Sequence, residues 1–330
     1  RKDMRIAING MGRIGRLLFR RLIQDPKFTI AAVNDIMDPA NLKYLLQYDS
    51  LYGPFPGKLD LEGEEIISGN HRVAVLQEAD PSRLPWKALD IDVALECSGR
   101  FTQLAAASQH LQAGARKVLL STTGSADVPL LIYGFNQHQL NGDTPVISPG
   151  GCMTNCSTHI LYILNAIGIE SAQINVLHSY TSRQELVDTA HTQFRRGRAA
   201  AESIIPVEVD LAQSLKRLLP LITEINAVST RVPVTNGALA DFTVQLSTPV
   251  SRGQINALFR TASQGEYKGI LDYTEDPLVS ADIKGNTHSC IIDGSLTSVA
   301  GRQVKLIAWF DNEYGYTSRI IDWLNYFDKN

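Results

Sequence analysis

Hydrophobic positions in the first 150 residues fall into short continuous runs, and amphipathic segments separate these runs. Residues 12–25 and 103–115 repeat apolar side chains at helical spacing, which predicts a helix in each. Five runs rich in β-branched residues are typical of buried parallel strands: 4–9, 28–35, 91–99, 117–123 and 145–148. Strands that alternate with helices in this way predict an α/β fold with a doubly wound parallel sheet.

Beyond residue 150 the pattern changes to longer segments in which apolar and polar residues alternate. A helix is predicted over 251–265, and a long polar segment from Thr181 to Pro206 is typical of a functional loop. We expect two domains: an α/β domain over 1–150, on which a C-terminal helix, 316–330, packs back, and an α+β domain over 151–315. The alternating segments predict a mostly antiparallel sheet in the second domain: 171–180, 225–234, 240–248, 288–301 and 303–312.

Three glycines follow the first predicted strand and lead directly into the first predicted helix. The spacing Gly10-x-Gly12-x-x-Gly15 is weak evidence by itself, because such glycines often form only a tight turn. Here Asp35 ends the second predicted strand at the distance of about 20 residues that dinucleotide sites require. The glycines would let N–H groups approach a pyrophosphate. Asp35 would accept ribose hydroxyls and repel a 2′-phosphate, which favours NAD over NADP; the alternative is a solvated strand end.

One of the four cysteines, Cys152, follows a Pro-Gly-Gly turn and precedes a predicted helix. A helix N-terminus stabilises an anion, so this position is expected to lower the pKa of the thiol towards that of a reactive nucleophile. His178 lies in a predicted strand and could complete a Cys-His pair. Two alternatives stay open at this point: a small buried cysteine at a turn, and a histidine satisfied in the core.

The composition narrows the class of protein. The chain has 330 residues, 44% of them hydrophobic, which suits two domains of roughly 100–200 residues each. A net charge of -3 and a pI near 6.2 argue against a nucleic-acid binder. No apolar run reaches the ~18 residues that span a bilayer, so we expect a soluble, cytoplasmic protein without a membrane partner. Cys152 and Cys156 lack the further ligands of a zinc set, and no metal site is expected.

Eight motifs, in order along the whole chain, carry a resemblance to a known family. They are INGMGRIGR, VND, ECSGRFT, CMTNC, HSYT, RRGRAAAESIIP, TRVPV and WFDNEYGYTSR. Together they resemble the phosphorylating glyceraldehyde-3-phosphate dehydrogenases and the closely related erythrose-4-phosphate dehydrogenases. The resemblance implies an NAD-binding Rossmann domain, a catalytic domain, NAD-dependent oxidation of a sugar-phosphate aldehyde, and a homotetramer with the Thr181 to Pro206 loop at the subunit interface.

The resemblance also assigns roles to individual residues. Cys152 would attack the aldehyde and His178 would act as the base, so that a thiohemiacetal becomes a thioester while hydride passes to NAD. Thr181 and Arg231 would bind the substrate phosphate; an ordinary strand end and a solvated cation are the alternatives. The cofactor positions that the resemblance implies are Gly10, Gly12, Arg13, Ile14, Gly15, Asp35, Ser98, Ser121, Asn312 and Tyr316.

The sequence departs from the phosphorylating pattern around its second anion site. Gly151 and Met153 stand where such members carry serine and threonine beside the nucleophile. Val209 and Asp210 replace a Thr-Gly pair that helps to hold inorganic phosphate, whereas Arg196 of that site is kept. We therefore expect a weakened phosphate site, with hydrolysis or an altered deacylation of the thioester. Neutral drift with a rearranged anion site is the alternative.

A further departure adds positive charge near the expected substrate phosphate. Arg183 stands where the family usually has an aspartate, although a solvent-facing Arg183 is as compatible with the sequence. The segments GSADVP and SIIPVEV look more like the erythrose-phosphate branch, whereas Asn-Asp at the ribose position does not. Two other functions stay open: an ordinary phosphorylating glyceraldehyde-3-phosphate dehydrogenase with a rearranged anion site, and a non-catalytic NAD-binding regulatory protein.

Overall fold

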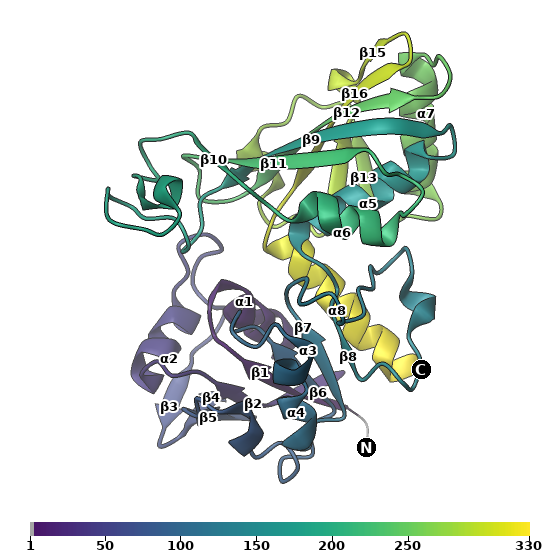
Figure 1. The fold of residues 1–330 in the computed structure, drawn as a ribbon. Helices are drawn as coiled ribbons and strands as arrows, with labels where there is room; N and C mark the ends of the chain where they lie inside the picture. The colour runs from purple at the N-terminus through teal and green to yellow at the C-terminus, as the bar shows by residue number, and fades with distance from the viewer. Residues whose placement is uncertain (1–2) are drawn as a thin grey trace. The chain divides into compact units, whose positions relative to one another are not determined.

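A computed structural model describes residues 3–330, which divide into two compact units (Figure 1). The first unit is Arg1–Gly151 together with Arg319–Asn330, and the second is Cys152–Ser318. Each unit is built on one sheet. The predicted fold class is confirmed: the first sheet is mainly parallel and the second mainly antiparallel. Among residues 3–330, no helix has the length and apolar character needed to cross a membrane.

The first sheet has the strand order β3-β4-β5-β2-β1-β6-β7-β8. Its central strand β1 is buried at five of its six positions, as a continuous apolar run requires in a parallel sheet covered on both faces. All pairs are parallel except β3 with β4 and β4 with β5, a meander that the sequence pattern does not predict. The strands are β1 (Met4–Asn9), β2 (Phe28–Asn34), β3 (Asp60–Glu62), β4 (Glu65–Ser68), β5 (His71–Leu76), β6 (Val93–Glu96), β7 (Lys117–Leu120) and β8 (Val146–Ile147).

Short helices connect the strands of the first unit. They are α1 (Arg13–Leu22), α2 (Pro39–Gln47), α3 (Leu104–Ala107) and α4 (Gln109–Gln112), with 3-10 turns at Pro81–Arg83 and Gln137–Gln139. The prediction of one helix over 103–115 is wrong, because the segment forms α3 and α4 with Ser108 between them. The Ser108 hydroxyl donates to the Leu104 carbonyl at 2.6 Å, so a side chain competes with the backbone at the break.

The C-terminal helix α8 (Tyr314–Lys329) crosses the division between the units, and its part from Arg319 onward belongs to the first. Trp323 on this part is fully buried. Its ring meets that of Tyr133 edge-on, with the centroids 5.8 Å apart, and Tyr326 packs on the other two rings. An aromatic cluster therefore holds the end of the helix within the first unit.

The second sheet has the order β10-β11-β9-β12-β16-β14-β13, with β15 paired to β16. Only β11 with β9 and β13 with β14 run parallel among these pairs. Strand β12 alternates buried and half-buried positions throughout, which matches its alternating sequence. The strands are β9 (Ile169–Ser179), β10 (Ile205–Val207), β11 (Ile225–Val232), β12 (Ala238–Leu246), β13 (Leu271–Thr274), β14 (Cys290–Asp293), β15 (Ser298–Ala300) and β16 (Gln303–Phe310).

Helices α5 (Cys152–Leu164), α6 (Leu211–Leu218) and α7 (Arg252–Gln264) pack against this sheet (Figure 1). The prediction of a single strand over 288–301 is wrong, because a 3-10 turn at Gly294–Leu296 separates β14 from β15. A Cβ at Gly294 would lie 2.2 Å from the Tyr273 hydroxyl, which explains a glycine at this turn. Two further 3-10 turns lie at Phe194–Gly197 and Ser280–Ile283.

Candidate functional site

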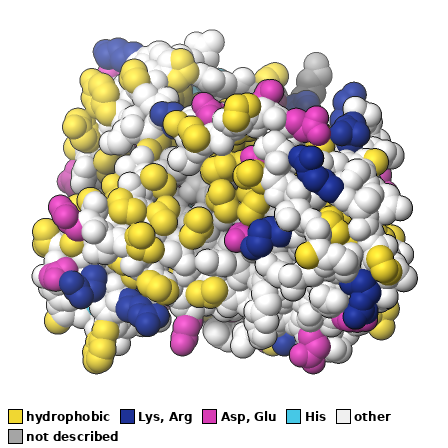
Figure 2. Space-filling view, turned by 90° about the horizontal axis from the view of Figure 1, so that it is seen from above, with side chains coloured by type: hydrophobic (Ala, Val, Ile, Leu, Met, Phe, Trp, Pro, Cys, Tyr) yellow, Lys and Arg dark blue, Asp and Glu magenta, His cyan; other side chains and the backbone are white. Residues whose placement is uncertain are grey.

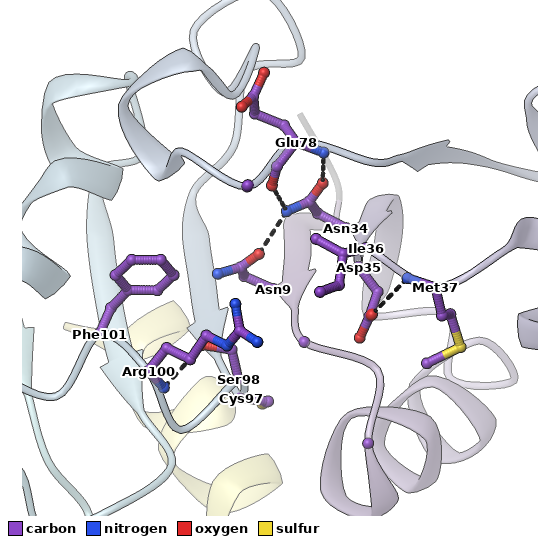
Figure 3. A pocket seen from close by; sticks show the side chains of 13 residues that line it. Asn9, Asn34, Asp35, Ile36, Met37, Glu78, Cys97, Ser98, Arg100 and Phe101 are labelled. Carbon is purple, nitrogen blue, oxygen red and sulfur yellow. Dashed lines mark hydrogen bonds between the residues drawn. The ribbon is translucent and has the colours of Figure 1, made fainter.

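A cavity of about 290 Å³ opens in the first unit where β1, β2 and β6 end (Figure 3). The carboxyl ends of neighbouring parallel strands are where ligands bind in doubly wound sheets. Four of the predicted cofactor residues line this cavity: Gly10, Gly12, Asp35 and Ser98. Ile36 and Phe101 add apolar surface to the lining of the cavity. The cavity therefore combines polar strand ends with surface on which a flat ring can lie.

The glycines of the loop after β1 differ in what they do. Gly10 has a φ of +91°, and a Cβ there would lie 2.4 Å from Ser98 Cα. A Cβ on Gly15 would lie 2.1 Å from the Gly10 carbonyl oxygen, so close packing requires this glycine too. A Cβ on Gly12 would meet no protein atom within 4 Å. Gly12 lines the cavity directly before α1, so it leaves room for a pyrophosphate at the helix N-terminus.

The Asp35 carboxylate joins the two loops that border the cavity. Its Oδ2 accepts from the backbone N–H of Met11 at 2.7 Å, and its Oδ1 accepts from that of Met37 at 3.0 Å. Each carboxylate oxygen has further acceptor capacity, so Asp35 can also accept a ribose hydroxyl. The glycine cradle and this carboxylate fit NAD, which supplies hydride acceptance when bound.

Four predicted cofactor residues of the first unit do not line the cavity: Arg13, Ile14, Gly15 and Ser121. The Arg13 guanidinium forms an ion pair with Asp49, and Ile14 follows it in the first turn of α1. The Ser121 side chain bonds to Cys97, while its backbone N–H donates to the Glu96 carbonyl at 3.0 Å. The role that the resemblance gives these residues at the cofactor stays a prediction.

Two asparagines at the cavity were not among the predicted residues. Asn9 and Asn34 end β1 and β2, and Asn34 Nδ2 donates to Asn9 Oδ1 at 2.7 Å (Figure 3). Asn34 also exchanges hydrogen bonds with the backbone of Glu78. The available signal was an asparagine at the last position of two neighbouring strands, where side chains reach a shared sheet edge.

The predicted nucleophile and base meet in the second unit. Cys152 is the first residue of α5 and His178 the last residue but one of β9, and Cys152 Sγ lies 3.8 Å from His178 Nε2. His178 Nδ1 lies 2.7 Å from the Ser179 carbonyl oxygen. A carbonyl only accepts, so Nδ1 carries the proton and Nε2 presents its lone pair to the thiol. The pair is therefore oriented for proton transfer from sulfur to nitrogen.

Burial determines the charge state of this pair. It raises the pKa of the Cys152 thiol to about 11, against the opposing attraction of Arg231 and the Met153 N–H. Burial and the repulsion of Arg231 lower the pKa of His178 to about 3. The backbone N–H groups at the start of α5 lower the thiol pKa, as the helix position predicts, but desolvation has the larger effect and raises the net value. Near pH 7 the pair is a neutral thiol and a neutral imidazole.

Asn312, a predicted cofactor residue of the second unit, lies close to His178. Asn312 is 9% exposed, and its Oδ1 accepts from the Gly237 N–H at 3.0 Å and from the Ser179 hydroxyl at 3.3 Å. These bonds orient the side chain and leave its amide nitrogen as the group that can meet a ligand. Tyr316, on the first turn of α8, is buried.

Arg231 is a buried cation beside Cys152 and His178. It lies on β11 as the register partner of His178 on β9, and it is 8% exposed. Its Nε and Nη1 have no hydrogen-bond partner among residues 3–330. Arg183 and Arg196 lower the pKa of Arg231 further, so the three guanidinium groups lie within electrostatic range of one another. This concentration of positive charge is suited to a multiply charged oxyanion.

The remaining predicted anion residues have separate local contacts. Thr181 Oγ1 accepts from the Arg183 N–H at 3.3 Å, which fixes the turn after β9. Arg196 Nε donates to Gln193 Oε1 at 2.5 Å. Asp210 is exposed and precedes α6 without a capping side-chain bond, and Val209 is half-buried. No cluster of three or more metal-ligating side chains occurs among residues 3–330.

Comparison with protein-family models agrees with both units. Residues 4–104 match the NAD binding domain of glyceraldehyde 3-phosphate dehydrogenase, and residues 151–312 match the C-terminal domain of the same enzyme. The protein is thus an NAD-dependent dehydrogenase of a phosphorylated aldehyde. The chain belongs to the glyceraldehyde 3-phosphate dehydrogenase family, and NAD is its cofactor.

Proposed function

We propose that this protein oxidises a phosphorylated aldose, glyceraldehyde 3-phosphate or erythrose 4-phosphate, through a thioester on Cys152 that water resolves in preference to phosphate. The observation that carries the oxidation is the 3.8 Å contact of Cys152 Sγ with the lone pair of His178 Nε2, beside the buried Arg231. The residues of the second anion site support attack by water on the thioester in preference to attack by phosphate.

The chain's residues divide the reaction into steps that balance. The Cys152 thiol adds to the aldehyde carbon, so that a C–S bond forms and the carbonyl becomes a hydroxyl, with the thiol proton passing through His178 Nε2. That nitrogen then accepts the hydroxyl proton as hydride leaves the same carbon for the cofactor, which yields a thioester. His178 releases this proton to solvent. Water then adds to the thioester carbon while His178 Nε2 takes one of its protons; the C–S bond breaks, and the departing Cys152 thiolate takes that proton from His178, which leaves the free acid as product.

Arg231 serves this sequence in two ways. Its buried guanidinium, with two nitrogens that have no partner among residues 3–330, is suited to the substrate phosphate. It also attracts the thiolate and repels an imidazolium at its register partner. Thr181 and Arg183, at the end of β9, complete the proposed substrate-phosphate site.

Hydrolysis is favoured by what surrounds the thioester. Gly151 and Met153 carry no hydroxyl, and each missing hydrogen bond to a charged group removes about 1.5–3 kcal/mol of phosphate binding. The exposed Asp210 would repel an attacking phosphate by about 1–4 kcal/mol at 4 Å. Arg196 alone of that site keeps a positive charge. An ordinary phosphorylating reaction is the competing proposal. Arg183 lies close enough to Arg196 to interact with its charge, and two nearby cations favour the binding of phosphate.

The test is NADH formation from each of the two aldehydes, with and without phosphate or arsenate, with analysis of the product. The proposal expects turnover without phosphate and a free carboxylate as product. Strong phosphate dependence with an acyl phosphate product would establish the ordinary phosphorylating enzyme. Cys152→Ala should abolish turnover while NAD still binds; turnover that survives this change would refute the mechanism, and no turnover in the wild type would leave the regulatory NAD-binding protein.

Quaternary structure and location are part of the same proposal. The segment from Thr181 to Pro206 exposes large apolar side chains, with Phe194 88% exposed and Val187, Ile204 and Leu186 also open to solvent. A monomer gains little from such exposure, so we assign this segment to contacts within a cytoplasmic homotetramer. The face in Figure 2 carries Lys and Arg interspersed with Asp and Glu, which does not suit a nucleic acid. Sedimentation of the wild type and of Phe194→Ser tests the assembly.

A further inference from the structure

A fully buried carboxylate lies at the end of β6, next to the nucleotide cavity, and the basic side chain that contacts it is His110. Glu96, the last residue of β6, is 1% exposed. Its Oε1 accepts from Asn9 Nδ2 at 2.5 Å and lies 2.9 Å from His110 Nε2, and its Oε2 accepts from the N–H and the hydroxyl of Ser98 at 2.9 and 2.7 Å. Four hydrogen bonds thus satisfy a buried carboxylate that opens the ECSGRFT motif but was given no role by the sequence analysis.

The direction of these bonds is fixed by a tryptophan. The Trp86 indole N–H lies 2.9 Å from His110 Nδ1, and an indole nitrogen can only donate. His110 Nδ1 is therefore the acceptor, so the proton of the neutral ring is on Nε2 and points to Glu96. Trp86 and His110 are both fully buried. The Trp86–His110–Glu96 series consequently ends on a carboxylate that accepts at both oxygens.

This polarity extends to the cavity through Ser98. Because the Ser98 hydroxyl donates its only proton to Glu96, its oxygen can only accept from any other group. The Arg100 N–H uses one acceptor position at 3.2 Å, and Ser98 lines the cavity (Figure 3). Asn34 Nδ2 likewise gives its hydrogens to Asn9 and Glu78. With Asp35, these side chains present acceptors to the cavity, which Arg100 also lines, and acceptors suit the hydroxyl and amino donors of a nucleoside.

We propose that Glu96 and His110 are positioning residues of the dinucleotide site, which fix the Ser98 hydroxyl as a hydrogen-bond acceptor towards the bound nucleoside. Glu96 does not touch the ligand; it acts by deciding which way the Ser98 proton points. The inference rests on the assignment of this cavity to the cofactor, and it goes beyond the family's motif, in which the glycine loop and Asp35 bind NAD.

The test is a double-mutant cycle on NAD affinity, measured by calorimetry on folded protein. Glu96→Gln replaces one acceptor oxygen by an amide that can only donate, and we expect NAD to bind about tenfold more weakly, as for one lost oriented hydrogen bond. Ser98→Ala should have a similar effect. If Glu96 acts through Ser98, the double variant binds no more weakly than Ser98→Ala. Full additivity would mean that Glu96 has only a structural role and would overturn the proposal.

Histidine variants keep the proposal testable should Glu96→Gln fail to fold. His110→Gln can accept from Trp86 with its oxygen and donate to Glu96 with its nitrogen, whereas His110→Leu can do neither. We expect His110→Gln to retain NAD affinity within about twofold, and His110→Leu to lose it to the same extent as Ser98→Ala. Equal affinities of the two histidine variants would contradict a role of the directed bond.

Two controls separate the possible failures. Asp293→Asn alters another buried carboxylate that bonds a tryptophan, at 3.1 Å from Trp309 Nε1, but in the second unit. This change should lower thermal stability and leave NAD affinity unchanged. If Ser98→Ala and Asp35→Ala both leave NAD affinity unchanged, the cavity is not the cofactor site, and the inference is overturned together with that assignment. The proposed deacylation by water would not be affected by this outcome.

Discussion

Arg231 and His178 are register partners on the parallel strands β11 and β9, and the guanidinium acts on both His178 and Cys152. Burial lowers the pKa of His178 and Arg231 lowers it further, whereas Arg231 opposes the rise that burial causes in the pKa of Cys152. One buried cation thus favours a thiolate over an imidazolium at the same site. The relationship joins the proposed substrate-phosphate site to the chemistry of the proposed nucleophile.

Removal of this cation should make the thiol less acidic. In Arg231→Gln the attraction on Cys152 is lost, so we expect its pKa to rise and alkylation by iodoacetamide at pH 8 to slow about tenfold. The modified Cys152 peptide is followed by mass spectrometry. Arg302→Gln, which removes a cation paired with Glu170 at an exposed position, is the control and should react like wild type. An unchanged rate in Arg231→Gln would show that Arg231 acts only on the substrate.

Stability should depend on pH through His178. Its folded pKa of about 3 lies below the ordinary 6.5, so the unfolded chain binds a proton that the folded chain refuses as pH falls from 6.5. The loss reaches about 2 kcal/mol at pH 5. Urea midpoints of wild type and His178→Asn should therefore diverge between pH 7 and 5, with the variant less sensitive to acid. Parallel midpoints at the two pH values would contradict a neutral, buried His178.

Cys152 sets the opposite limit of the same stability profile. A thiol with a raised folded pKa is favoured while protonated, so stability is present below the unfolded pKa of 9.0 and is lost as pH rises towards about 11. Between pH 7 and pH 10, Cys152→Ser should therefore lose less stability than the wild type does. If the two proteins lose stability equally between pH 7 and 10, burial of the neutral thiol is not the cause.

The glycine loop gives a prediction in which two similar substitutions differ. Gly10→Ala places a Cβ 2.4 Å from Ser98 Cα at a φ of +91°, so we expect misfolding of the first unit or a loss of several kcal/mol. Gly12→Ala meets no protein atom within 4 Å, so it should fold normally and bind NAD at least tenfold more weakly, because its methyl group occupies the pyrophosphate space. Thermal unfolding and calorimetry measure the two effects. Normal NAD binding by Gly12→Ala would refute the assignment.

The sequence pattern predicted the elements that carry the site residues better than the short strands at the edge of the first sheet. Strand β1 and the start of α5 at Cys152 follow from local signals, a continuous apolar run and a Pro-Gly-Gly turn. The β3-β4-β5 meander did not, because its strands are only three to six residues long and obtain their order from the pairing of β5 with β2. Short strands are specified by pairing rather than by periodicity.

The charge states of the site residues could not be predicted from the sequence either, because they depend on residues that lie far apart along the chain. The thiol pKa depends on burial and on Arg231, which lies 79 positions from Cys152 and reaches it only through the pairing of β11 with β9. Likewise, Glu96 and His110 are 14 positions apart and meet only when α4 packs near β6. A local motif marks the type of side chain that a site needs, whereas its charge state is decided by residues that folding brings near.

The second anion site allows the deacylation step to be tested by restoration. Gly151→Ser, Met153→Thr and Asp210→Gly return two hydroxyls and remove one carboxylate, so the affinity for attacking phosphate should rise at least tenfold for each restored contact. The triple variant should therefore yield an acyl phosphate where wild type yields a carboxylate, as measured by phosphate-dependent NADH formation and product analysis. Asp241→Asn is the matched control, because it removes an acidic charge on β12 that pairs with Lys305 on β16. This variant should leave the product unchanged. A triple variant that still hydrolyses its thioester at saturating phosphate would place the cause of hydrolysis elsewhere, in access of water to Cys152 rather than in the loss of phosphate contacts.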